Sequence, residues 1–166
     1  MKNKALFLDR DGVINKRPPQ GDYVKKWDEL EFNPGIEKLI AWANKNNYLV
    51  IVITNQRGVG RKLMSKKDLE MVHTKIVLEL QKKGAKITKV FSCIHNEEDN
   101  CDCRKPKPGL LFQAAKEFDI DLSKSLMIGD QQTDIQAAQS AGCSSLLIEP
   151  NSRILISTVS EIIKNR

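Results

Sequence analysis

The sequence predicts a three-layer α/β fold, in which a parallel sheet lies between two layers of helices. Short apolar runs of strand length alternate along the chain with longer stretches of helical periodicity. The first run, from Ala5 to Leu8, is unbroken, as expected of a strand buried on both faces of a parallel sheet. Polar residues directly follow several of these runs, and open α/β sheets place their functional sites at such strand ends.

Local signals place each element along the chain. Strands are expected at residues 5–8, 48–53, 90–92, 125–128 and 145–148, which are short and mainly apolar. The first helix is expected to begin with Asn33 as its N-cap and Pro34 as its first residue. Further helices are expected between Ser65 and Gly84, from 108 to 118, from about 131 to Gly142, and at 159–164.

Length and composition indicate one globular domain over residues 1–166. A chain of 166 residues is long enough to bury one sizeable core. The net charge of +6 comes from lysines scattered over helix-like stretches, without a basic patch interleaved with aromatic residues. No apolar run is long enough to span a membrane, and the first is too short for a signal peptide. We therefore expect a cytoplasmic monomer that binds a small anionic ligand rather than nucleic acid or a membrane.

Two aspartates stand directly after the first predicted strand. Asp9 and Asp11 are two residues apart, and Gly12 permits the change of direction that keeps both carboxylates near one point. Carboxylates held close together favour a shared Mg²⁺ ion, which prefers oxygen ligands. One of them can also attack phosphorus while the second transfers a proton. The alternative for this motif taken alone is a solvated turn.

The segment from Lys16 to Asn33 lacks regular periodicity and contains Pro18, Pro19 and Gly21. A long irregular loop beside a site is a candidate lid or specificity loop. The alternative is a surface excursion without substrate contact.

Thr54 begins the polar stretch after the second predicted strand. A hydroxyl group and backbone N–H groups at a strand end suit a phosphate oxygen. Gly58 and Gly60 do not form a nucleotide-binding phosphate loop, because the Gly-x-x-x-x-Gly-Lys pattern is absent.

Three cysteines and a histidine lie close together in the sequence after the third predicted strand. Cys93, His95, Cys101 and Cys103 offer three thiolates and one imidazole, a tetrahedral ligand set that Zn²⁺ prefers. Four protein ligands leave no open position, so such a zinc ion would be structural and would order a loop with little to pack. The alternative is a chance cluster of reduced cysteines. Cys143 has an apolar context and is expected in the core.

Further charged residues follow. Arg104 and Lys105 begin a stretch stiffened by two prolines, which suits the presentation of cations to a phosphoryl group, although a plain solvated basic turn is the alternative. Asp130 follows the fourth predicted strand and is therefore expected at the same sheet edge as Asp9. Asp134 lies one helical turn further on and faces the same way.

The motifs Asp9-x-Asp11-Gly12, Thr54-Asn55, Lys105 and Gly129-Asp130-x-x-x-Asp134 occur in this order. Over essentially its whole length, the chain thereby resembles the haloacid dehalogenase (HAD) superfamily of phosphatases. The Cys-x-His and Cys-x-Cys pairs, followed by Arg-Lys-Pro, resemble the small subclass III members. The resemblance implies a Rossmann-like HAD fold with a parallel sheet, only a short loop as its cap, and a structural zinc loop at residues 93–103.

The resemblance also implies catalytic roles. Asp9 would be the nucleophile that forms an aspartyl-phosphate, and Asp11 the general acid and base. Mg²⁺ would be held by the Asp9 side chain, the Asp11 backbone carbonyl and Asp130. Lys105 would neutralise the phosphoryl group, and Asp134 would orient Lys105 or the metal site. These roles are physically consistent, because a carboxylate that attacks a phosphate dianion needs cations to offset the repulsion.

Phosphoryl and substrate contacts are implied at further positions. Thr54 is expected among the catalytic residues, where it would bind the phosphoryl oxygens. The residues expected to bind substrate are Gly21, Asp22, Tyr23, Asn55, Gln56, Arg57 and Arg104.

The substrate class implied by the resemblance is a small phosphorylated metabolite. Residues 54–65 and the Gly-Asp-Tyr-Val stretch at 21–24 resemble the members that remove the 7-phosphate of D-glycero-D-manno-heptose 1,7-bisphosphate, in heptose activation for cell-surface glycans. The gap between His95 and Cys101 and the Pro18-Pro19 pair resemble histidinol-phosphate phosphatases. Gln131 departs from the lysine that heptose enzymes often carry. We expect the heptose bisphosphate, with histidinol phosphate as the alternative.

Two other functions fit the sequence less well. A phosphate-binding module without turnover is disfavoured because Asp9, Asp11 and Lys105 are all present. A mutase is disfavoured because only the segment 16–33 is available as a cap.

Overall fold

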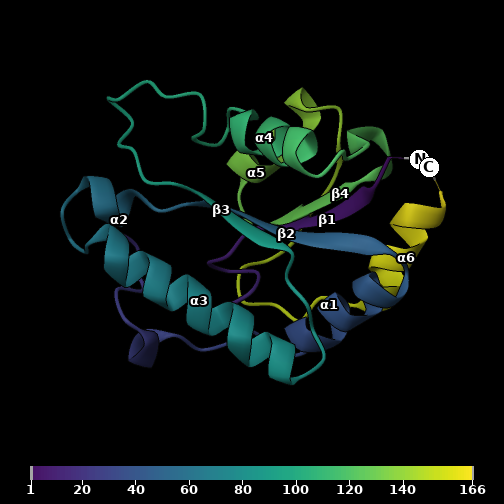
Figure 1. Cartoon of the computed structure of the whole chain (residues 1–166), viewed down its shortest axis with the longest axis horizontal. Helices are drawn as coiled ribbons and strands as arrows, with labels where there is room; N and C mark the ends of the chain where they lie inside the picture. The colour runs from purple at the N-terminus through teal and green to yellow at the C-terminus, as the bar shows by residue number, and fades with distance from the viewer. Residues whose placement is uncertain (1, 166) are drawn as a thin grey trace.

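A computed structural model describes residues 2–165 and contains a five-stranded parallel sheet with the order β3-β2-β1-β4-β5 (Figure 1). The strands are β1 (Lys4–Leu8), β2 (Tyr48–Asn55), β3 (Lys89–Cys93), β4 (Leu126–Gly129) and β5 (Ser144–Leu147). The central strand β1 pairs Leu8 with Val52 of β2 and with Ile128 of β4. The predicted α/β class is therefore confirmed.

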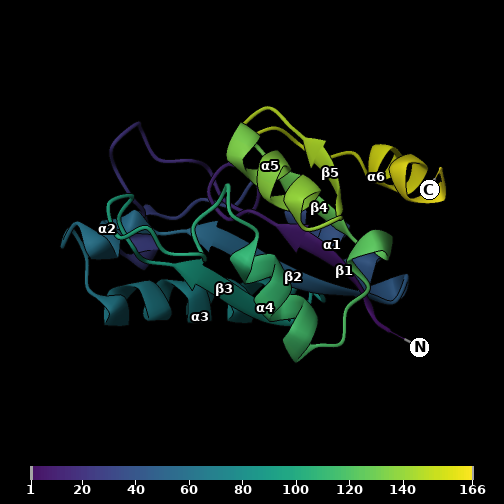
Figure 2. The same ribbon diagram turned by 90° about the horizontal axis from the view of Figure 1, so that it is seen from above.

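Helices cover both faces of the sheet (Figures 1 and 2). One face carries α1 (Ile36–Lys45), α3 (Lys66–Lys82) and α6 (Ile156–Lys164), and the other carries α4 (Gly109–Glu117) and α5 (Gln132–Ser140). Successive side chains of a strand point to opposite faces. Accordingly, Leu6 and Leu8 of β1 pack in the core beneath α1 and α3, whereas Ala5 and Phe7 pack beneath α4 and α5.

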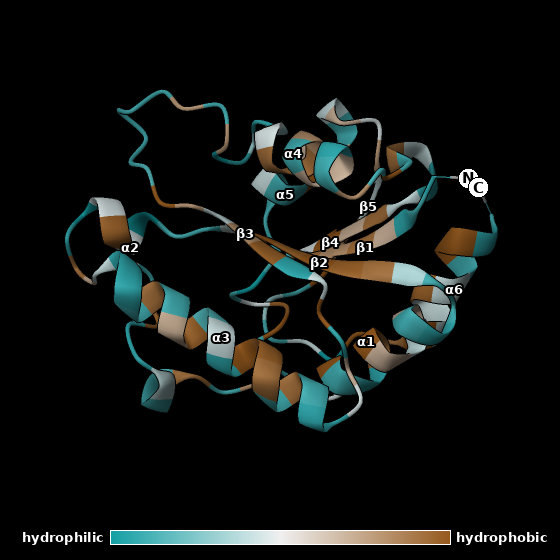
Figure 3. Ribbon diagram, in the orientation of Figure 1, coloured by the Kyte–Doolittle hydropathy of each residue, from teal (hydrophilic) through white to brown (hydrophobic). Residues whose placement is uncertain are grey.

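Hydropathy follows this layering, with apolar residues on the strands and on the inner sides of the helices (Figure 3). The loop that follows β3 is mainly hydrophilic in the same view. Such a loop buries little apolar surface, so packing alone contributes little to its order. None of the helices described is both long and apolar enough to cross a lipid bilayer.

The start of α1 differs from the prediction. Its N-cap is Gly35, whose φ of 81° suits glycine, and Ile36 is its first helical residue. Asn33 is buried, and its side-chain amide donates hydrogen bonds to the carbonyl oxygens of Gly12 and Val13, each at 3.0 Å. Because Asn33 fastens the loop after β1 in this way, it does not cap the helix.

Other helix boundaries agree with the sequence or extend it. Ser65 caps α3 through a capping box with Asp68, as its spacing predicts. Helix α6 begins at Ile156, earlier than the predicted 159. The short elements α2 (Arg57–Gly60) and the 3₁₀ turns Trp27–Glu29 and Leu122–Lys124 were not predicted, because one-turn helices have little periodicity.

All five strands run in the same direction, so their carboxyl ends meet at one edge of the sheet. The loop after β1, helix α2 and the loop after β3 gather at this edge in both views (Figures 1 and 2). The polar residues that follow β1, β2 and β4 are thereby brought to one place.

Candidate active site

A cavity of about 400 Å³ lies at the carboxyl edge of the sheet, within the size range of small-molecule sites. All four residues predicted to be catalytic line it: Asp9, Asp11, Thr54 and Lys105. Asn55 and Gln131 also line it, and the loop after β1 supplies residues 17–23 as one wall. The segment 16–33 is therefore not a distant surface excursion.

Lys105 occupies a buried position between two carboxylates. Its Nζ lies 2.8 Å from Asp9 Oδ1 and 2.6 Å from Asp134 Oδ1, and it donates to the Ile53 carbonyl at 2.9 Å. Burial by itself lowers the pKa of Lys105, but the charges of Asp9 and Asp134 outweigh it and raise that pKa, so the ammonium group is retained. Asp134 therefore contacts Lys105 directly, as the orienting role predicted for it requires.

Asp9 has a strongly perturbed pKa. Burial raises the pKa of its carboxyl group to about 7, and this effect outweighs the opposing charge of Lys105. The Asp9 carboxyl group therefore exchanges a proton near neutral pH, and a further cation beside it would lower its pKa.

Asn55 and Gln56, at the end of β2, hold the catalytic residues in place through hydrogen bonds. Asn55 holds the main chain of Lys105 at both sides, since its Nδ2 donates to the Lys105 carbonyl and its Oδ1 accepts from the Lys105 N–H, each at 3.1 Å. Gln56 is fully buried, and its Nε2 donates to Asp11 Oδ2 at 2.8 Å and to Thr54 Oγ1 at 2.9 Å. Gln56, expected to bind substrate, therefore lies behind the cavity wall and contacts the site residues instead.

Asp11 is held by several donors. It accepts from Arg10 Nη2 at 2.9 Å, from Asn15 Nδ2 at 2.9 Å and from Gln56 Nε2 at 2.8 Å. Burial alone raises the pKa of Asp11, but the charge of Arg10 and these hydrogen bonds together bring it below its ordinary value. Asp9 and Asp11 therefore have opposite pKa shifts although they are neighbours in sequence.

Asp130 is the third carboxylate at this edge. Its side chain has no exposed surface, burial raises its pKa to about 6, and Arg17 Nη2 lies 2.6 Å from its Oδ1. Gly12, with a φ of 97°, passes so close that an added Cβ would overlap Asp130 Oδ2. Oxygens of Asp9, Asp130 and Asp134 lie within 4.8 Å of one another, which fits a hard cation.

The cavity wall formed by the loop after β1 contacts the α2 region. Gly21, Asp22 and Tyr23 line the cavity, and the Tyr23 ring packs so closely on Gly58 that an added Cβ would meet it at 2.9 Å. Arg57 Nε donates to Tyr23 Oη at 3.4 Å, but Arg57 does not line the cavity itself.

Two arginines predicted to bind substrate share one acidic partner. Arg57 Nη1 lies 2.7 Å and Arg104 Nη2 lies 3.2 Å from Glu97 Oε1. Arg104 lines a second hollow that adjoins the main cavity, and Asn55, Lys105 and Gln131 line both. Arg104 is thus placed beside the site, whereas Arg57 reaches it through Tyr23.

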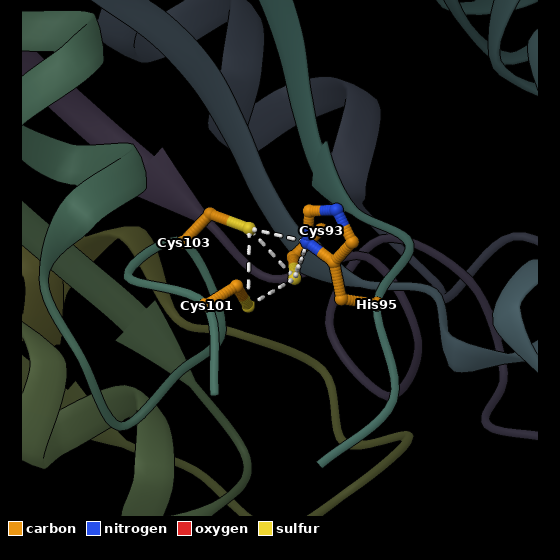
Figure 4. A group of neighbouring side chains, drawn as sticks. All are labelled: Cys93, His95, Cys101 and Cys103. Carbon is orange, nitrogen blue, oxygen red and sulfur yellow. Dashed lines mark hydrogen bonds between the residues drawn. The ribbon is translucent and has the colours of Figure 1, made fainter. Parts of the chain in front are cut away.

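The four predicted zinc ligands converge (Figure 4). Cys103 Sγ lies 2.8 Å from Cys93 Sγ and 3.5 Å from Cys101 Sγ, and His95 Nδ1 lies 3.2 Å from Cys103 Sγ. Ligand atoms about 2.3 Å from a tetrahedral zinc ion are roughly 3.8 Å apart, so this set fits zinc once the Cys93 and Cys103 sulfurs move apart by about 1 Å. Cys143 is buried in the core as expected.

Comparisons with known proteins agree with this geometry. The HAD-hydrolase-like family model matches residues 102–152. The chain is 41% identical to a D-glycero-alpha-D-manno-heptose-1,7-bisphosphate 7-phosphatase of Campylobacter jejuni, over 89% of this chain and 83% of that protein. It is 43% identical to the corresponding beta-anomer enzyme of Helicobacter pylori, over 84% and 79% of the two chains. The chain belongs to the HAD superfamily of phosphatases.

The fold of this HAD phosphatase also matches that of a solved structure. The D,D-heptose 1.7-bisphosphate phosphatase from B. bronchiseptica, complexed with magnesium and phosphate, matches with a TM-score of 0.85 and 31% identity over 98% of both chains. The predicted HAD fold is therefore confirmed over nearly the whole chain.

Three side chains of this HAD phosphatase were not singled out by the sequence. Arg10 is fully buried and contacts Asp11 and, through Nη1, His73 Nε2 at 3.1 Å. Asn15 donates to Asp11, and Arg17 pairs with Asp130. The position of Arg10 between the two aspartates was a usable signal, whereas nothing in the sequence pairs Arg17 with a residue so far along the chain.

Proposed function

We propose that this HAD phosphatase removes the 7-phosphate of D-glycero-D-manno-heptose 1,7-bisphosphate through an aspartyl-phosphate on Asp9. One observation carries the proposal: in a chain about 40% identical to heptose-bisphosphate phosphatases, the Asp9 carboxylate lies in a cavity 2.8 Å from the buried Lys105 ammonium. A carboxylate beside a fixed cation suits in-line attack on a phosphate dianion, because the cation offsets the charge repulsion.

Mg²⁺ is the metal that fits the carboxylate cluster. Asp9 and Asp130 would hold it with their side chains, and Asp11 with its backbone carbonyl. When bound, the ion would neutralise charge on the phosphoryl oxygens and favour the ionised form of Asp9. The buried oxygens of Asp130, which accept no well-oriented hydrogen bond, support this assignment.

The chain's own residues supply the remaining steps. Lys105, fixed by Asp134 and by the Asn55 amide, would bind a phosphoryl oxygen. Thr54 Oγ1 accepts a hydrogen bond from Gln56, which leaves the Thr54 proton free to donate to a second phosphoryl oxygen. In the first step Asp11 would protonate the leaving alkoxide, which requires that substrate binding raise its pKa above the lowered value found here. Once ionised again, Asp11 would take a proton from the water that attacks the aspartyl-phosphate.

Substrate recognition would come from the two sides of the cavity. The loop residues Gly21, Asp22 and Tyr23 offer polar groups for sugar hydroxyls, and Arg104 offers a cation in the adjoining hollow. A structural Zn²⁺ on the Cys–His cluster would keep Arg104 and Lys105 in position, because Cys103 directly precedes them.

The test compares phosphate release from four substrates with Mg²⁺ present. We expect kcat/KM for a heptose 1,7-bisphosphate to exceed that for histidinol phosphate by at least about 100-fold. The alpha and beta anomers are assayed separately, because the two relatives compared above are named for different anomers. Heptose 7-phosphate lacks the 1-phosphate, so its kcat/KM shows how much that group contributes. An Asp9→Asn preparation controls for contaminating phosphatases, and a preference for histidinol phosphate would contradict the substrate assignment.

A further inference from the structure

Arg17 is the cation that contacts Asp130 in this structure. Its Nη2 lies 2.6 Å from Asp130 Oδ1, and no other side-chain cation in residues 2–165 pairs with that carboxylate. With the Gln131 amide in the orientation that satisfies its surroundings, the Gln131 oxygen also accepts from Arg17 Nη2 at 2.8 Å. The guanidinium is thus held by two consecutive residues that directly precede α5.

The charges around this contact explain why a cation is needed there. Asp9, Asp130 and Asp134 bring three buried carboxylates together, and Lys105 contacts only Asp9 and Asp134. Asp130 would therefore be buried without an opposite charge if Arg17 were absent, which is costly. A divalent ion bound to Asp130 would supply that charge instead and make the Arg17 contact unnecessary.

The main chain of Arg17 is fastened independently of its side chain. Its N–H donates to Asn151 Oδ1 at 2.7 Å, and the N–H of Lys16 donates to the Glu31 carbonyl at 2.8 Å. The Arg17 side chain lines the cavity and is 31% exposed. It has room to rotate away from Asp130 while the loop stays in place.

We infer that Arg17 is an exchangeable counter-ion that competes with Mg²⁺ for Asp130 and leaves the carboxylate when the metal binds. The inference rests on the metal site of the proposed function. It makes metal affinity depend on a residue of the cap loop that is not itself a metal ligand. The metal-free cavity is kept closer to charge balance, at the expense of weaker Mg²⁺ binding.

Calorimetric titration with MgCl₂ at about pH 8, where Asp130 is ionised, tests the competition. Arg17→Gln removes the competing charge and should bind Mg²⁺ roughly fivefold to tenfold more tightly than the wild type. Lys16→Gln is the matched control, because it removes the same charge from the preceding residue, whose side chain pairs with Glu31 at 2.6 Å outside the cavity. Equal affinities for Arg17→Gln and the wild type, or an equal gain in Lys16→Gln, would overturn the inference.

A second measurement uses the wild-type protein. The ¹⁵Nε–H NMR signal of Arg17 can be assigned by its absence from the Arg17→Gln spectrum. In the wild type this signal should shift when Mg²⁺ is added. In Asp130→Asn the addition of Mg²⁺ should leave it where it was. No shift in a wild type saturated with Mg²⁺ would refute displacement of Arg17. If Asp130→Asn bound Mg²⁺ as tightly as the wild type, the metal site itself would be wrong, and the inference would fall with it.

Discussion

The carboxylate cluster (Asp9, Asp130 and Asp134) takes its members from the ends of two strands and from a helix far along the chain. The Cys–His cluster (residues 93, 95, 101 and 103) comes from one short stretch, the last residue of β3 and the loop that follows it. The carboxylates are buried by the sheet and by Lys105, so their arrangement depends on the folded core. The Cys–His loop is mainly hydrophilic and has little apolar surface to bury (Figure 3). We therefore expect the first cluster to persist without metal and the second to depend on it.

The largest expected effect comes from Asp9→Asn. An amide cannot form the aspartyl-phosphate, so kcat should fall by at least about 10³-fold. The fold should persist, because an uncharged side chain of the same size suits a buried site. Steady-state phosphate release and thermal unfolding measure the two effects. Asp121→Asn, which changes a partly exposed carboxylate in the turn before β4, is the control. Retained activity in Asp9→Asn would contradict the assignment of Asp9 as the nucleophile.

Lys105→Met should affect both stability and activity. It leaves Asp9 and Asp134 facing each other without their shared ammonium, and breaking a buried ion pair on one side costs about 3 to 5 kcal/mol. Urea unfolding measures this loss, and kcat should fall with it. Lys107→Met removes a half-exposed lysine from the same loop and should leave stability nearly unchanged. Equal unfolding midpoints for the two variants would contradict a buried, charge-coupled Lys105.

Loss of zinc should act on substrate binding rather than on the core. In Cys101→Ser we expect KM to rise several-fold with a smaller change in kcat, because the loop that carries Arg104 loses its anchor. Metal analysis verifies the zinc loss, and trypsin should cleave the Arg104–Lys105 bond faster. Cys143→Ala, in the core, should keep the zinc and the wild-type KM. An unchanged KM after verified zinc loss would show that the cluster does not position the site.

The most gradual expected effect concerns pH and the stability of the metal-free protein. Burial raises the pKa of Asp9 to about 7, against 3.8 as the ordinary value. Between these values the folded state holds a proton that the unfolded chain has released, so stability from this group is present below about pH 3.8 and is lost as the pH rises through 7. Asp9→Asn lacks this dependence. The stability difference, wild type minus variant, should therefore fall by up to about 1.4 kcal/mol per pH unit in this window.

Urea unfolding at several pH values in Mg²⁺-free buffer measures the difference. Because groups that do not contact Asp9, such as His73, titrate equally in both proteins, their contributions cancel in the comparison to first order. Parallel stability curves for the two proteins would mean that Asp9 has an ordinary pKa.

Sequence patterns were sufficient wherever the signal is local. The strand positions and the Ser65 cap depend on spacing within a few residues, and they agree with the structure to within two residues. The four residues predicted to bind zinc lie close together. The predicted start of α1 was wrong because the Asn33 side chain donates to the carbonyl oxygens of Gly12 and Val13 instead of capping the helix. Gln56 was expected to bind substrate, but its amide turns beneath the cavity toward Asp11.

The sequence by itself determined the α/β fold, the HAD motifs and which residue types reach the carboxyl edge of the sheet, because strand direction and side-chain alternation are encoded locally. Tertiary structure alone decided the partners of those residues. It paired Arg17 with Asp130, placed Asn55 against the Lys105 main chain, and gave Asp9 and Asp11 opposite pKa shifts. Burial and the charges brought close by folding set these properties, and neither can be read from neighbours in the chain.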